Sequence, residues 1–322
     1  MSAGRTTESA NERRSSRARW ARAVGILIGL VGTAFVVRVL VQNREEVGTA
    51  TANADWVPLV GAFIAACLGM TGIGLAWRAA LRTLGARLGV LSSLRGYFVG
   101  QLGKYVPGGV WAIMGRGEWA RAEGVGGPVA YSSVLLSMGS AYLAAILLSA
   151  TLMPFARILG SSGELRLLLV LLLLPLGFAL IHPRIASQVL GLLRRFTRRP
   201  LEMAVPRWGH SASIVLRQVP SWLLIGSASA LIGMALGDSG DLANIVVATS
   251  VAWVVGFIAL PVPGGIGVRE ATFVTLATSM SPPIAATVAV IARVIFVLVD
   301  VIGAAVTSAA VARSAVSEAV KR

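Results

Sequence analysis

Long apolar stretches alternate with short polar loops along most of this chain. Six windows are long enough to cross a bilayer, which takes roughly 20 apolar residues when the segment is helical. They span residues 22–41, 57–76, 128–152, 165–181, 214–236 and 284–311. Two further apolar segments, 91–120 and 243–280, are interrupted by proline and glycine. The pattern therefore predicts an all-α integral membrane protein with six full transmembrane helices and two broken or re-entrant helical hairpins.

Composition supports the membrane assignment. Hydrophobic residues make up 56% of the chain and charged residues 13%, which leaves too little polar surface to cover a water-soluble globule of 322 residues. Cys67 is the single cysteine, so the sequence excludes intramolecular disulfides and cysteine-rich metal sites. The stretch from Gly100 to Tyr105 lacks the upstream glycine of a nucleotide-binding loop, and Tyr105 stands where that loop has the Ser or Thr that binds the metal. We expect no cofactor, no bound metal and no enzymatic activity.

The distribution of charge predicts how the chain is oriented. The net charge is +15, and the basic residues collect in alternate loops, as the positive-inside rule requires. This distribution favours a membrane topology over nucleic-acid binding. We expect a basic, disordered N-terminus in the cytoplasm, a single membrane domain, an Arg-rich cytoplasmic loop and a cytoplasmic tail, at residues 1–21, 22–311, 182–211 and 312–322. The expected location is the cell membrane.

The two interrupted segments share a break of similar composition. Proline removes a helical amide and paired glycines loosen the backbone, so each break should end a helix. The half-segments are shorter than a spanning helix. Orientation then makes residues 57–152 and 214–311 an inverted-topology repeat, which places a binding site near the midplane where the hairpin tips meet. The expected tip residues are Pro107, Gly108, Gly109, Trp111, Pro263, Gly264 and Gly265.

Three basic residues flank these breaks at expected membrane depth. Lys104 precedes the first break, Arg116 follows it, and Arg269 follows the second. A compact ammonium and planar guanidinium groups suit the phosphate of an anionic head group. For Lys104 the alternative is a lysine that snorkels to the interface from an interfacial hairpin.

Four further charges are candidate counterions or gates. Glu118 and Glu270 lie too near Arg116 and Arg269 along the helix to face them, so we expect partners across the repeat. They act either as gates that yield to lipid phosphate or as static salt bridges. Arg293 and Asp300 lie on one face of the last span. We expect them to pair with Glu270 or Arg269, or with each other through water, and to form either a structural latch or a substrate or proton path.

At the two breaks the sequence resembles a known family. The stretches from Gly100 to Trp111, with Gly115 and Arg116 after them, and from Pro261 to Ala271 resemble the signature stretches of the lysylphosphatidylglycerol synthase transmembrane, or flippase-like, family. The resemblance implies a membrane domain that, in bifunctional members, translocates an aminoacylated phospholipid made by an attached aminoacyltransferase domain. We expect a stand-alone membrane domain here, without that synthase domain.

Together these features predict a lipid translocase. Its expected cargo is an anionic phospholipid or a polyprenyl-phosphate-linked lipid. The alternative is a membrane scaffold that presents lipid to a separate lipid-modifying or glycosyltransferase enzyme, and a membrane transferase is a third hypothesis. The expected partners are membrane lipids and, in the scaffold case, that enzyme. The sequence predicts no oligomeric state.

Overall fold

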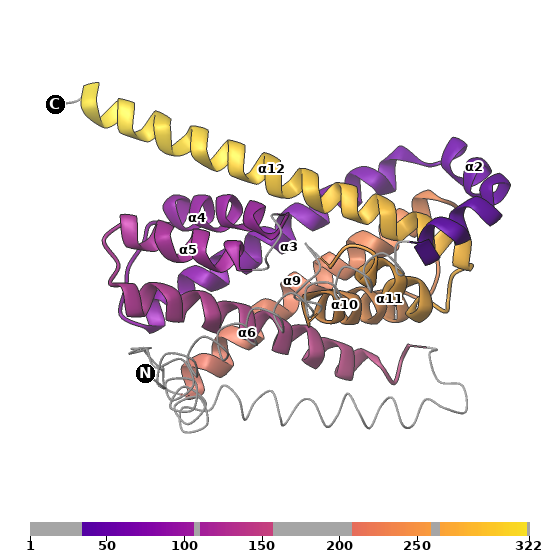
Figure 1. Cartoon of the computed structure of the whole chain (residues 1–322), viewed down its shortest axis with the longest axis horizontal. Coiled ribbons are helices and arrows are strands. Elements are labelled where there is room, and N and C mark those ends of the chain that lie inside the picture. Colours follow the sequence, from indigo (N-terminus) through magenta and orange to yellow (C-terminus); the bar gives the residue numbers. More distant parts are fainter. Residues whose placement is uncertain (1–33, 106–109, 157–207, 259–264, 321–322) are drawn as a thin grey trace, which may run out of the picture.

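A computed structural model describes residues 34–105, 110–156, 208–258 and 265–320, and their regular structure is helical (Figure 1). Four helices in this part of the chain are long and apolar enough to cross a membrane. They are α3 (Trp56–Thr83), α6 (Gly127–Leu152), α9 (Trp208–Ala235) and α12 (Pro282–Val320). They confirm four of the six predicted spans. The other two, 22–41 and 165–181, lie mostly or wholly outside the described residues, as does most of the predicted basic loop.

The two interrupted segments form pairs of short helices. In chain order the elements are α4 (Val90–Leu102), the short 3-10 helix η1 (Gly103–Tyr105), α5 (Trp111–Ala122), α10 (Leu242–Ile258) and α11 (Val268–Leu276). The helices end where proline and glycine predict, although residues 106–109 and 259–264 themselves are not described. Gly265 needs its glycine, because its φ is +65° and a Cβ there would lie 2.8 Å from the carbonyl oxygen of Gly256.

Glycines let the two helices of the first hairpin pack closely. A Cβ on Gly96 would lie 2.2 Å from the ring of Trp119, and one on Gly100 would lie 2.4 Å from Cγ of Arg116. Small residues at such positions let the backbones of two helices approach closely. In a membrane this close packing drives helix association, because lipid tails are as apolar as the helices themselves. The close approach fixes the position of Arg116 relative to α4.

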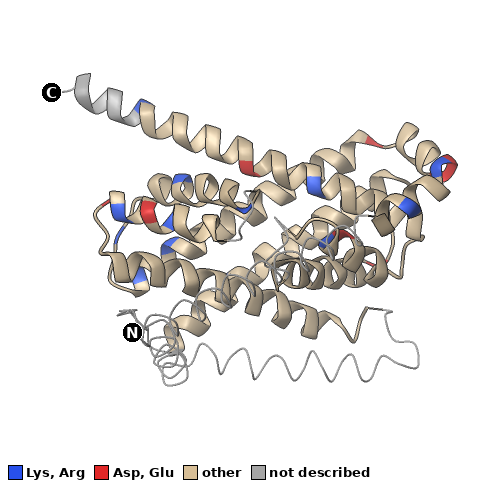
Figure 2. Cartoon of the chain, viewed as in Figure 1, with Lys and Arg blue, Asp and Glu red and all other residues tan. Residues whose placement is uncertain are grey.

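The hairpins lie toward opposite ends of the long helices. Figure 1 shows α4 and α5 near one end and α10 and α11 near the other, beside α2 (Arg44–Ala52). Helices α3 and α12 run toward the α4–α5 end, whereas α6 and α9 run away from it. Basic residues gather around the α4–α5 end in Figure 2. The loops at the other end include Asp55, which caps α3 by accepting a hydrogen bond of 2.9 Å from the Val57 amide.

The centre of the fold is the antiparallel contact between α3 and α9. Gly69 lies directly against α9: a Cβ there would be 2.8 Å from Cγ1 of Ile225 and 2.9 Å from the carbonyl oxygen of Ser221. Buried indoles join this pair to α6, since Trp77 donates to the Ser133 hydroxyl at 3.0 Å and Trp222 to the Ala141 carbonyl at 2.6 Å. These bonds satisfy polar groups that are otherwise expensive to bury.

We expect Gly69→Ala to destabilise the fold, because the added methyl group meets the backbone of α9, which cannot rotate away. Overpacking of this kind takes about 1–3 kcal/mol from stability. The measurement is the apparent thermal unfolding midpoint of the purified protein in detergent. The matched control is Gly139→Ala in α6, where an added Cβ meets nothing within 4 Å. Equal midpoints for the two variants would contradict the assigned α3–α9 packing.

Candidate functional site

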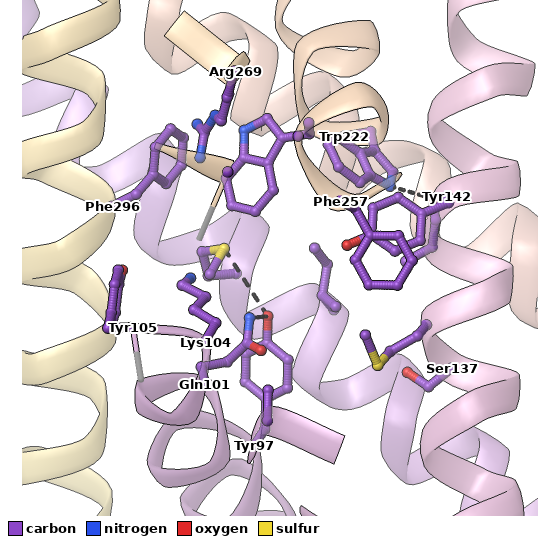
Figure 3. Close-up of a pocket in the computed structure, with 18 of the residues that line it drawn as sticks. Tyr97, Gln101, Lys104, Tyr105, Ser137, Tyr142, Trp222, Phe257, Arg269 and Phe296 are labelled. Carbon is purple, nitrogen blue, oxygen red and sulfur yellow. Dashed lines mark hydrogen bonds between the residues drawn. The ribbon is translucent and has the colours of Figure 1, made fainter. Parts of the chain in front are cut away.

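A cavity of about 140 Å³ lies where the two hairpins meet the long helices (Figure 3). Lys104 reaches it from η1, Arg116 from α5, Gly265 from the second break and Arg269 from α11. Arg293 lines it from α12. The structure therefore brings the three predicted head-group residues to one cavity, although they are far apart in the sequence.

Lys104 links the first hairpin to α12. Its Nζ lies 2.5 Å from Oδ2 of Asp300, and the hydroxyl of Tyr105 donates to the same oxygen at 2.7 Å. Asp300 is fully buried, at 0% exposure. A carboxylate at such a position is tolerable because an ammonium and a hydroxyl both compensate it. Its other oxygen, Oδ1, has no hydrogen-bond partner among the described residues.

Glu270 and Arg293 form a second ion pair. Glu270 is 7% exposed, and its carboxylate binds the guanidinium of Arg293. Its second oxygen accepts a hydrogen bond of 2.7 Å from the amide of Gly267. The carboxylate thereby satisfies a free amide at the start of α11 and complements the positive end of the helix dipole. This pairing is one of those left open for Arg293 by the sequence.

Two arginines at the cavity have no carboxylate partner among the described residues. Arg116 is 3% exposed, donates from Nη2 to the amide oxygen of Gln101 at 3.3 Å, and lies 5.4 Å from the ring centre of Tyr97. Arg269 lies over the ring of Trp253 at 3.7 Å. Aromatic faces stabilise a guanidinium without neutralising it. Four cations and two carboxylates therefore leave the site with two excess positive charges.

The prediction that the two glutamates pair across the repeat is wrong. Glu118 is exposed on α5, where it pairs with Arg121 at 3.1 Å and accepts a hydrogen bond from the Tyr131 hydroxyl. Residues two apart on a helix point in nearly opposite directions, so Glu118 faces away when Arg116 faces the cavity. Glu270 likewise pairs within its own half. Among the described residues, the ion pair that joins the two halves is Lys104 with Asp300, which the sequence did not predict.

The predicted tip residues are only partly described. Gly265 lines the cavity, and Trp111 begins α5 with a half-exposed side chain. The remaining five lie outside the described residues: Pro107, Gly108, Gly109, Pro263 and Gly264.

The structure adds an aromatic lining that sequence reasoning missed. Tyr142 stacks on Phe257 with ring centres 4.2 Å apart, and Trp253 meets Phe296 edge-on at 5.3 Å. These four residues, together with Tyr97, line the cavity. Aromatic residues inside apolar helices resemble ordinary core residues, so only the tertiary arrangement distinguishes them.

We expect Lys104→Met to destabilise the protein strongly, because it leaves the carboxylate of Asp300 buried without its cation. Breaking a buried pair from one side typically takes about 3–5 kcal/mol from stability. The double variant Lys104→Met/Asp300→Asn should recover most of this loss, since Tyr105 can donate to the new amide oxygen. Thermal unfolding of both single variants and the double variant measures the coupling. Strictly additive losses would contradict the pairing.

Comparison with known proteins agrees with this arrangement. Residues 22–304 match the family model described as the lysylphosphatidylglycerol synthase TM region. No curated protein matches the sequence. The match covers both hairpins and all the charged residues of the cavity. With the apolar helices, it supports a multi-pass membrane protein with a lipid-related role. This chain belongs to the lysylphosphatidylglycerol synthase transmembrane-region family.

Proposed function

We propose that this protein is a lipid translocase that binds the phosphate-bearing head group of an anionic phospholipid or a polyprenyl-phosphate-linked lipid. The observation that carries the proposal is the pair of arginines, Arg116 and Arg269, that face one cavity without carboxylate partners among the described residues. Guanidinium groups bind phosphate oxygens in a bidentate geometry. A phosphate at this position supplies negative charge that the described residues do not provide.

The size of the cavity favours a lipid head group as the occupant. Pockets that enclose drug-sized ligands have volumes of roughly 300–1,000 Å³, whereas this cavity measures about 140 Å³. It therefore accommodates a phosphate and a small substituent but not acyl or prenyl chains. Those chains remain in the bilayer, against the apolar outer faces of the long helices. Lys104 joins the two arginines while it stays paired with Asp300, because its ammonium has three N–H donors.

The proposed topology gives such a site access to both leaflets. Helices α4 and α5 contain 13 and 12 residues, about 20 and 18 Å at 1.5 Å per residue, against about 30 Å for the hydrocarbon core. We assign both hairpins as re-entrant, the first from the cytoplasm and the second from outside, within an inverted repeat of residues 57–152 and 214–311. Rocking of one half against the other then exposes the cavity to each side in turn.

In this scheme the protein lies in the cell membrane and crosses it with six full spans. Both termini are in the cytoplasm. Transport runs downhill or is coupled to an ion gradient. We assign no catalytic reaction to the chain, and its primary partner is membrane lipid.

The topology predicts which loops face the cytoplasm. In a Cys67→Ala background, single cysteines at Arg87 and Glu123 should react with a membrane-impermeant maleimide only after the inner face is exposed. Cysteines at Asn53 and Ser239 should react in intact cells. All four positions are exposed, so accessibility reports the side of the membrane. Labelling of Glu123→Cys and Arg87→Cys from opposite sides would mean that the first hairpin spans the membrane.

The function predicts phosphate-selective exchange in liposomes. Wild-type protein should accelerate leaflet exchange of labelled anionic or polyprenyl-phosphate lipid, and Arg116→Gln/Arg269→Gln should slow it at least about tenfold, because each charge-assisted hydrogen bond contributes roughly 1.5–3 kcal/mol. Glutamine keeps the Cγ that packs on Gly100. The control is Arg121→Gln, which removes an exposed arginine already paired with Glu118.

Equal rates for the double variant and the control would refute the assigned site. If folded wild-type protein exchanged no lipid at all, the translocase would be wrong. The scaffold for a separate lipid-modifying or glycosyltransferase enzyme would then be favoured, and copurification with that enzyme would be the next measurement.

A further inference from the structure

The contact between α6 and α9 joins the two halves of the proposed repeat. Gln218 on α9 donates from Nε2 to the Ser137 carbonyl of α6 at 3.3 Å, and Trp222 donates to the Ala141 carbonyl at 2.6 Å. Both bonds join residues that are 81 positions apart, so the two helices run parallel and in register. Their first residues are also 81 positions apart, so both helices begin at the same level, toward the α4–α5 end.

Four polar residues lie along this contact, and we call them the polar seam: Ser133 and Ser137 on α6, and Ser211 and Gln218 on α9. Residues four or seven apart share a face of a helix, so each pair lies on the face that carries the hydrogen bond. All four are at most 1% exposed. Three of their polar atoms, Oγ of Ser137, Oγ of Ser211 and Oε1 of Gln218, have no hydrogen-bond partner among the described residues. Such groups are rare inside native proteins, so three in one contact point to bound water.

Close packing alone does not account for the seam. Serines are common where membrane helices approach each other, and their hydroxyls can bond within the helix, as Ser149 of α6 does to the Ala145 carbonyl at 2.8 Å. Ser137 makes no such bond among the described residues. Gln218 is a long side chain, and burying its amide oxygen without a partner is unfavourable where an apolar side chain would fit. The polarity therefore indicates a ligand that forms hydrogen bonds.

The spacing of the polar groups suits single water molecules. At 1.5 Å per residue, the register places Ser133 about 4.5 Å deeper than Ser211, and Ser137 about 6 Å deeper than Ser133. A water that bridges two hydroxyls spans about 5.5 Å, because each O–H···O bond is about 2.75 Å long. The Ser133 hydroxyl donates to the Ala130 carbonyl and accepts from the Trp77 indole, which leaves its second lone pair for a water. One water in each interval makes the seam continuous.

The two ends of the seam differ. Ser211 directly follows an exposed residue near the start of α9, whereas Ser137 lines the cavity and its hydroxyl points toward it in Figure 3. Beyond Ser137 the next layer consists of rings: Tyr142 stacks on Phe257 at 4.2 Å and lies 6.5 Å from Trp222. The seam thus leads from the surface at the α4–α5 end to the cavity and stops at these rings.

We propose that the polar seam binds a chain of water molecules that connects the cavity with the surface at the α4–α5 end. In the proposed topology this end is cytoplasmic, so a charged group in the cavity stays in contact with cytoplasmic water through the seam. Because α6 and α9 belong to different halves, the seam is also a surface at which rocking of the halves would part them. The inference takes only the membrane side from the proposed function and requires neither lipid binding nor transport.

Silver-ion access to single cysteines tests the path. The full chain with Cys67→Ala carries Ser211→Cys or Ser137→Cys and is placed in lipid nanodiscs, where both membrane faces meet the solution. Silver binds the thiolate, which forms where water reaches the sulfur. The thiols that remain are counted with a maleimide mass tag after denaturation. The matched control is Ser149→Cys, because Ser149 is also 1% exposed on α6 but lies on neither the seam nor the cavity.

We expect both seam cysteines to react at least about tenfold faster than Ser149→Cys, because a thiol beside water needs no local unfolding to react. Adding Gln218→Leu, which replaces the amide with an apolar side chain of similar size, should slow Ser137→Cys at least about tenfold and leave Ser211→Cys unchanged, since it interrupts the chain between them. Misfolding cannot imitate this result, because it would expose both cysteines and accelerate both reactions.

A seam cysteine that reacted as slowly as Ser149→Cys would overturn the inference and leave close packing as the role of the serines. Fast reaction of Ser137→Cys that Gln218→Leu did not slow would also overturn it, because water would then reach the cavity by another route. The proposed function fails separately: protein that showed the expected silver pattern but exchanged no lipid in liposomes would keep the hydrated seam and lose the translocase.

Discussion

A charge inside an apolar protein must be paired, hydrogen-bonded or given to a ligand, and the centre of this structure follows from that constraint. Asp300 at 0% exposure is tolerable only with Lys104 and Tyr105 beside it. These partners come from the first hairpin, so one buried carboxylate fixes the position of that hairpin against α12. Glu270 does the same within the second half through Arg293. The remaining two arginines lie against aromatic rings and have no carboxylate partner among the described residues, which leaves an excess of positive charge at the cavity.

The short helices make this arrangement possible. A continuous helix would carry its charges along a membrane span, whereas a break brings helix ends and their side chains to the middle of the protein. Glycine allows the approach. The aliphatic part of the Arg116 side chain packs on Gly100, and a Cβ added to Gly256 would lie 3.1 Å from Cβ of Arg269. Gly265, whose φ is +65°, lines the cavity, and irregular backbone inside a membrane protein is tolerated around such a space. The breaks, the glycines and the charges therefore serve one purpose, to present cations to a common space.

The sequence predicted the parts of this arrangement that depend on local rules. Helix ends near Leu102, Trp111, Ile258 and Val268 follow from proline and glycine, and the apolar windows located four long helices. Lys104, Arg116 and Arg269 stood out because charges are rare in apolar sequence. Their partners could not be predicted, since pairing depends on how helices rotate and cross. Glu118 shows this: its proximity to Arg116 in sequence places it on the opposite face, where Arg121 is its partner.

The aromatic lining was beyond sequence reasoning for a related reason. A tyrosine or tryptophan in a membrane helix has the same pattern whether it packs against lipid, protein or a cavity. Only in the folded protein do Tyr142, Phe257 and Trp253 meet around the space that the arginines face. Trp253 stacks on Arg269 and Tyr97 lies beside Arg116, so the rings that line the cavity are also the groups that hold its two arginines in place.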